Sequence, residues 1–168
     1  MLAILRSLGI QILFFVIIFQ VVSFLREMSM LSTDVQLATT NNQSFIQVPT
    51  LKGETVSLNS QGTTTVLYFF APWCQICHLS ISNLQALYEK NEHLDVVAVA
   101  MDYTSLDEVM AFTQEHKLTF PIALGNEAIK HHFSISSYPS YYVINEENTI
   151  IGKSIGYSSE LGLYLRSL

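Results

Sequence analysis

Two runs typical of buried strands, with a helical pattern between them, constrain the fold of this chain most strongly. Thr64–Phe70 is an unbroken run of β-branched, apolar and aromatic residues, which is typical of a strand covered on both faces. Apolar side chains then recur at helical spacings of four, three and four residues, at Cys77, Ile81, Leu84 and Tyr88. A second buried run, Asp95–Met101, follows. This order predicts two parallel strands joined by a right-handed helical crossover.

Shorter patterns on either side extend this unit into a larger sheet. A hairpin is predicted before it, and a helix, a strand, a second helix, another hairpin and a final helix are predicted after it. These elements are expected at Phe45–Val48 and Thr55–Leu58, from Ser105 to Lys117, at Thr119–Leu124, Asn126–Phe133, Tyr141–Ile144 and Thr149–Ile155, and from Ser158 or Ser159 onward. The fold class is therefore α/β, a central mixed sheet flanked by helices, within one domain over residues 44–168.

The N-terminal segment has a different composition. Leu8–Leu25 is almost entirely apolar, and no residue between Arg6 and Arg26 is charged. Its length is close to the roughly 20 residues that a membrane-spanning helix needs. We expect an uncleaved signal anchor, a transmembrane helix over residues 1–27, followed by a polar tether over residues 28–43. A cleaved signal peptide is the alternative, although no small-residue cleavage site follows the apolar stretch.

The charge and the cysteine content argue against several classes of function. The net charge is −6 and the 8 basic residues are scattered, which argues against a nucleic-acid partner. The chain has only 2 cysteines, so a multi-bridge scaffold and a four-cysteine zinc site are both excluded. The adjacent His131 and His132 would point to different sides of a helix. We therefore expect no metal site and no cofactor.

The two cysteines, Cys74 and Cys77, lie where the first buried strand gives way to the helix. Two cysteines three residues apart on a first helical turn come close enough to form a disulfide. The free N–H groups of a helix N-terminus favour a thiolate, which predicts Cys74 as the attacking thiol and Cys77 as the resolving one. Trp73 is expected to cover one side of this pair. His78 either adds positive charge near Cys74 or is an exposed first-turn residue.

Most other polar and aromatic residues near the predicted strand ends have simpler explanations. Asp102 follows the second buried strand and is interpreted as a turn residue. Tyr141 and Tyr142 alternate on a strand, so one is expected in the core and the other beside a substrate groove. Three apolar residues of the following helix are expected in the core: Leu106, Val109 and Met110.

Two segments resemble a known family. Tyr68–Cys77 (YFFAPWCQIC) resembles the active-site strand and turn of the thioredoxin superfamily, and Ser137–Asn145 (SYPSYYVIN) resembles its cis-proline segment. The resemblance implies a thioredoxin-like three-layer fold. It also implies that Pro139 is cis beside the disulfide and that the backbone of Tyr138 pairs with a bound substrate. Gln75 and Ile76, between the cysteines, would belong to the active-site environment.

The additional helix and strand over Ser105–Leu124, together with the anchor, resemble the TlpA/ResA-like branch of this superfamily. Members of that branch are tethered to membranes, act outside the cytoplasm and often reduce disulfides, including those of apocytochromes. The resemblance thus implies a monomeric thiol–disulfide oxidoreductase that acts as a reductase on protein substrates and exchanges electrons with a redox partner protein. The location it implies is the periplasmic side of a bacterial inner membrane.

Other functions stay open at this stage. Tyr68 stands where thioredoxin has a buried Asp, and Gln75-Ile76 lacks the Pro common in the family, so an oxidase or isomerase remains an alternative. Cys74–His78 also spells the C-x-x-C-H pattern of c-type haem attachment. A third alternative is a thioredoxin-fold binding module that does no catalysis.

Overall fold

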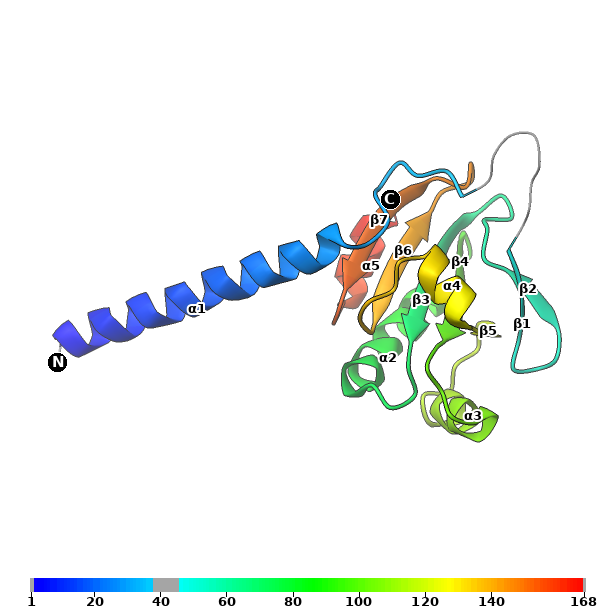
Figure 1. The fold of residues 1–168 in the computed structure, drawn as a ribbon, viewed down its shortest axis with the longest axis horizontal. Coiled ribbons are helices and arrows are strands. Elements are labelled where there is room, and N and C mark those ends of the chain that lie inside the picture. The colour runs from blue at the N-terminus through cyan, green and yellow to red at the C-terminus, as the bar shows by residue number, and fades with distance from the viewer. Residues whose placement is uncertain (1, 38–45, 168) are drawn as a thin grey trace.

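The computed structural model describes residues 2–37 and 46–167, and its centre is a five-stranded sheet in the order β5-β4-β3-β6-β7 (Figure 1). The strands are β3 (Thr64–Phe70), β4 (Leu94–Ala100), β5 (Ile122–Leu124), β6 (Ser140–Ile144) and β7 (Ile150–Ile155). β3 and β4 are parallel, with Val66 opposite Val96, as the strand–helix–strand pattern predicted. β5 is parallel to β4, whereas β6 and β7 are antiparallel to their neighbours. The mixed sheet is thereby confirmed.

Four helices surround the sheet: α2 (Gln75–Lys90), α3 (Leu106–Glu115), α4 (Glu127–His132) and α5 (Glu160–Arg166). Short polar side chains begin three of them. Ser105, Asn126 and Ser159 each accept a hydrogen bond from the backbone N–H three residues later. Such caps satisfy N–H groups that have no partner within the helix, which is why the predicted helix starts agree with the observed ones.

The core has two layers, one on each face of the sheet. Tyr68 and Phe70 of β3 pack with residues of α2, α3 and α5, whereas Leu67 and Phe69 pack with residues of α4 and of the hairpin β1 (Gln47–Pro49) and β2 (Thr55–Ser57). Successive side chains of a strand point to opposite faces, so a strand covered on both faces has to be apolar throughout. The three-layer arrangement is confirmed.

Two expectations about the core were wrong. Leu106 and Met110 of α3 are 49% and 39% exposed, because this helix faces the core with Val109, as expected, and with Phe112. Tyr141 and Tyr142 are both buried, since helices and loops cover both faces of β6. No tyrosine of β6 is therefore left to line a groove.

The N-terminal helix α1 (Leu2–Met28) extends away from the domain (Figure 1). Among the residues that the structure describes, no helix is long and apolar enough to cross a membrane. The membrane-spanning segment thus stays a prediction. After α1 the chain returns to the sheet, where Asp34 and Leu37 donate backbone hydrogen bonds to Ile150 and Asn148. This part of the predicted tether lies along the domain, while residues 38–43 and Phe45 lie outside the described residues.

Candidate active site

The disulfide Cys74–Cys77 closes the turn between β3 and α2, with 5.2 Å between the two Cα atoms. Cys74 is the N-cap residue of α2, and its Sγ accepts a hydrogen bond from the backbone N–H of Cys77 at 3.1 Å. Cys74 retains 7% exposure, whereas Cys77 is completely buried. An incoming thiol or disulfide can therefore reach Cys74 first, which agrees with its predicted role as the attacking residue.

The electrostatic surroundings of Cys74 favour negative charge on its sulfur. α2 is 16 residues long and carries no acidic residue in its first turn, so nothing there opposes the positive end of its dipole. The N–H group of Cys77 is already directed at the sulfur. When the disulfide is reduced, the same contacts stabilise a Cys74 thiolate.

The side chain of Tyr68 lies beneath the cysteine turn, on the face of β3 that α2 covers. Its hydroxyl donates to the carbonyl oxygen of Cys77 at 3.3 Å and lies 3.2 Å from Oγ of Ser80. Burial, and next the nearby Tyr141, raise the pKa of Tyr68 well above its ordinary value. This phenol therefore stays protonated at physiological pH. It supports the first turn of α2 and does not act as a base.

The second half of the site comes from the loop before β6. The Tyr138–Pro139 peptide bond is cis, as the resemblance implied. Pairing of β3 with β6 places Ser140 opposite Phe69, which brings Pro139 to the end of β3 where the cysteine turn begins. The rings of Trp73 and Tyr138 meet edge to face, with 6.0 Å between their centroids. The cysteine turn and the cis-proline loop are thus in contact.

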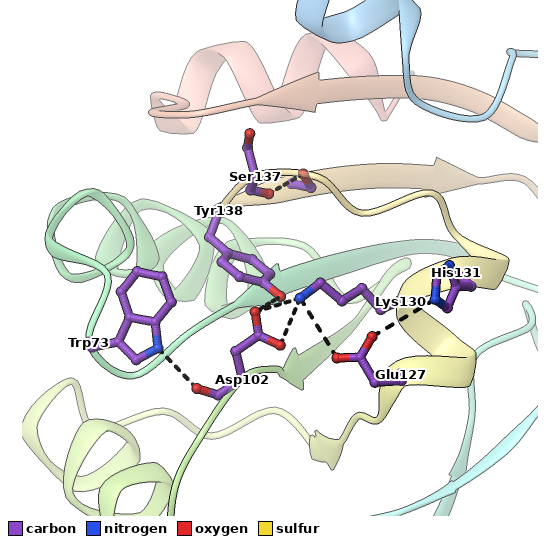
Figure 2. A network of polar contacts seen from close by, with 8 residues as sticks. Trp73, Asp102, Glu127, Lys130, His131, Ser137 and Tyr138 are labelled. Carbon is purple, nitrogen blue, oxygen red and sulfur yellow. Dashed lines mark hydrogen bonds and ion pairs between the residues drawn. The ribbon is translucent and has the colours of Figure 1, made fainter.

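Asp102 connects these two loops to α4, as Figure 2 shows. Its backbone carbonyl accepts a hydrogen bond from Nε1 of Trp73 at 2.9 Å. Its carboxylate accepts one from the hydroxyl of Tyr138 at 3.0 Å and pairs with Nζ of Lys130 at 2.6 Å. Burial, and next the hydrogen bond to Asp102, raise the pKa of Tyr138. Asp102 lies in a bend after β4, as its interpretation as a turn residue implied, but its side chain also joins these loops to α4, which that interpretation did not foresee.

His78 is held on both sides of its ring. One ring nitrogen, Nε2, lies 2.8 Å from the carbonyl oxygen of Pro72, and the other, Nδ1, lies 2.8 Å from Nε2 of His116. The ring also packs against Phe112, with 4.6 Å between the ring centroids. Its side chain is only 26% exposed, so the alternative of an exposed first-turn residue was wrong. Both ring nitrogens thus already have partners within the protein, Pro72 and His116.

Three apolar side chains around the disulfide face solvent. Trp73, Ile76 and Leu79 are 61%, 47% and 70% exposed, and Gln75 beside them is exposed as well. Exposed apolar side chains that gather in one place are typical of a surface that binds another molecule. The surroundings of Cys74 therefore suit an apolar stretch of polypeptide.

Two known proteins are similar to this chain in sequence. The chain is 33% identical over 113 residues to the thioredoxin-like protein YneN of Bacillus subtilis, a match that spans 64% of this chain and 65% of that protein. It is 32% identical over 118 residues to the thiol-disulfide oxidoreductase ResA of Oceanobacillus iheyensis, a match that spans 68% of this chain and 56% of that protein. The chain thus spans less than two thirds of the length of either relative.

A solved structure has a similar fold. The crystal structure of StoA from Bacillus subtilis superposes with a TM-score of 0.67 at 25% identity, covering 74% of this chain and 97% of that one. These matches confirm the thioredoxin-like resemblance. The AhpC/TSA family matches residues 41–153, a segment that contains both cysteines and the cis-proline. The chain therefore belongs to the AhpC/TSA family.

Proposed function

We propose that this protein is a thiol–disulfide oxidoreductase that exchanges the Cys74–Cys77 disulfide with cysteines of protein substrates, and that it works as a reductase. One observation carries the proposal: a cysteine at a helix N-terminus, which retains 7% exposure, is bonded to a completely buried one, beside a cis-proline loop. The relatives named thiol-disulfide oxidoreductases support the same chemistry.

In the reductive direction the Cys74 thiolate attacks one sulfur of a substrate disulfide. A Cys74–substrate bond forms, and the other substrate sulfur leaves as a thiolate. Cys77 then attacks the Cys74 sulfur, which breaks the Cys74–substrate bond; the proton of Cys77 passes to a released substrate thiolate. Two electrons have passed to the substrate, and Cys74–Cys77 is again a disulfide. A separate dithiol redox partner protein reduces it, and the protein acts as a monomer throughout.

The loops around the cysteines hold the substrate during this exchange. The exposed side chains of Trp73 and Ile76 bind apolar residues that flank the substrate cysteine. The backbone of Tyr138 pairs with the extended substrate chain, as the resemblance implies. Apocytochromes are among the candidate substrates, also through that resemblance.

Trapping of the mixed disulfide tests this function. With Cys77→Ala the attack by Cys74 cannot be resolved, so adducts that dithiothreitol releases should accumulate in cells. Cys74→Ala is the matched control and should trap far fewer adducts, because Cys77 is completely buried. Equal trapping by both variants, or none by either, contradicts the proposal.

We further propose that α1 anchors the protein in a bacterial inner membrane with the domain on the periplasmic side. The apolar side chains described on α1, such as Phe15, Ile17 and Phe19, are 70%, 52% and 71% exposed, so the domain does not cover them. An uncovered apolar surface of this kind is typical of contact with lipid.

Because the chain has only 2 cysteines, labelling tests the location directly. A maleimide that cannot cross membranes should label Cys74 in intact, reduced spheroplasts; labelling only after lysis contradicts the location.

A further inference from the structure

A cluster of three metal-ligating side chains lies next to the cysteine turn and has no part in the proposed exchange. His78 comes from the first turn of α2, whereas Glu115 and His116 end α3. Their ligand atoms all lie within 4.8 Å of one another. Nδ1 of His78 is 2.8 Å from Nε2 of His116 and 3.7 Å from the Glu115 carboxylate.

The hydrogen bonds determine where the ring protons lie. The carbonyl oxygen of Pro72 can only accept, so Nε2 of His78 carries a proton and donates it at 2.8 Å. In the neutral ring the lone pair of Nδ1 then faces His116. A metal-binding histidine is ordinarily held in this way, with one nitrogen on the ion and the other N–H donated to a carbonyl or carboxylate.

The surroundings suit metal binding in one further respect. Both imidazole rings pack on Phe112, with centroid distances of 4.6 Å for His78 and 4.7 Å for His116, which limits their rotation.

We propose that Nδ1 of His78, Nε2 of His116 and the carboxylate of Glu115 bind a divalent zinc ion. Two histidines and one carboxylate are a common zinc ligand set, and with bonds of about 2.0–2.2 Å its ligand atoms lie roughly 3.3 Å apart. The histidine nitrogens would separate by about half an ångström relative to their 2.8 Å hydrogen bond, and the carboxylate would approach from 3.7 Å. His116 would then carry its proton on Nδ1. The sequence analysis predicted no metal site. The proposed site combines ligands from two helices, α2 and α3.

The fourth zinc ligand is a water molecule or a side chain of another protein. Glu115 is 63% exposed, and an open hollow beside the cluster is lined by Pro72, Trp73, His78, Glu108, Phe112 and Glu115. A bound zinc ion would also affect the cysteine turn. It would increase the acidity of the His78 N–H group, which donates a hydrogen bond to Pro72, two residues before Cys74.

Zinc titration of the full chain in its disulfide form tests the site, because the oxidised cysteines provide no thiolate ligand. Competition with a chromophoric chelator should give one zinc per chain. His78→Gln and His116→Gln should each weaken binding by more than about 100-fold, beyond the 10–100-fold typical of losing an outer partner of a ligand. The exposed His93 provides the matched control, and His93→Gln should bind zinc as the unmodified chain does.

Two further measurements complete the test. Circular dichroism establishes that each variant is folded. In the unmodified chain, zinc should shift the imidazole resonances of His78 and His116 in nuclear magnetic resonance spectra and leave those of His93 in place. Absence of stoichiometric binding, or equal binding by the His116→Gln and His93→Gln variants, overturns the proposal. Because the disulfide is not exchanged in this experiment, its outcome is independent of the proposed function.

Discussion

The hydroxyl of Tyr138 donates a hydrogen bond to Oδ2 of Asp102 at 3.0 Å. Tyr138 precedes the cis-proline, and Asp102 follows β4, so this contact connects two loops at the same edge of the sheet. Lys130 of α4 pairs with the same carboxylate, and the indole of Trp73 donates to the backbone of Asp102. The residues on both sides of the disulfide are thereby held by one aspartate.

Tyr138→Phe tests how much this contact stabilises the loops. The change removes the hydroxyl and keeps the ring against Trp73. The free energy of unfolding should fall by about 1 kcal/mol, the usual net value of one hydrogen bond, as measured by denaturant unfolding of the disulfide form. Tyr164→Phe, at a tyrosine of α5 that is 41% exposed, is the control and should change stability little. Equal losses in the two variants would mean that the contact with Asp102 adds nothing.

Much of the fold could be predicted from the sequence because both faces of its central strand are buried. An unbroken apolar run identified β3 with its observed bounds, Thr64–Phe70, and the change of period after it identified α2. Capping side chains identified the helix starts. The predicted strand Thr119–Leu124 is observed only from Ile122, because Pro121 has no N–H to donate to a neighbouring strand.

The partners of the site residues could not be predicted in this way. The contact of His78 with His116 joins residues 38 positions apart, and that of Asp102 with Tyr138 joins residues 36 apart. Such contacts depend on how helices and loops meet, which no local spacing encodes. One signal was available for Asp102, since loops that follow neighbouring parallel strands gather at one sheet edge.

Ile76→Ser tests the apolar surface around Cys74. Because Ile76 is 47% exposed, its loss should cost about 1 kcal/mol of substrate binding and raise KM for a protein disulfide roughly fivefold. The reaction with oxidised glutathione, which is too small to cover this surface, should be unchanged. Leu161→Ser changes an equally apolar, 66% exposed residue of α5 and should affect neither reaction. A parallel fall with both disulfides in Ile76→Ser would instead indicate damage to the cysteine turn.

Tyr68→Phe tests whether the Tyr68 hydroxyl only stabilises the cysteine turn or also takes part in proton transfer. Without the hydroxyl, the buried Ser80 loses a partner and the carbonyl of Cys77 loses a donor, so unfolding should become easier by about 1–2 kcal/mol. The rate of insulin reduction should stay within about twofold of the unmodified chain, since a phenol with a raised pKa does not take up the proton of Cys77. A tenfold or larger loss of rate in a folded variant would assign Tyr68 a direct part in proton transfer.

Stability should fall in alkali through the buried tyrosines of β6. Burial raises the pKa of Tyr141 and of Tyr142 to about 12, against about 10 in the unfolded chain. The native state therefore holds these protons more tightly, so the contribution of the two tyrosines to the free energy of unfolding should be constant below pH of about 10 and decrease as the pH rises toward about 12. Denaturant unfolding across this range measures the fall, which Tyr142→Phe should make shallower. A fall as steep in Tyr142→Phe as in the unmodified chain would contradict this assignment.

The redox equilibrium of the full chain tests the central claim most directly. The protein is equilibrated in dithiothreitol and glutathione buffers, and alkylation followed by mass spectrometry counts the thiols of Cys74 and Cys77. The account predicts one reversible two-electron transition of this pair, near the potential of about −270 mV that reductants such as thioredoxin have. A reversible transition near about −120 mV would reverse the proposed direction. A pair that stays oxidised in excess dithiothreitol while the domain remains folded would contradict the account.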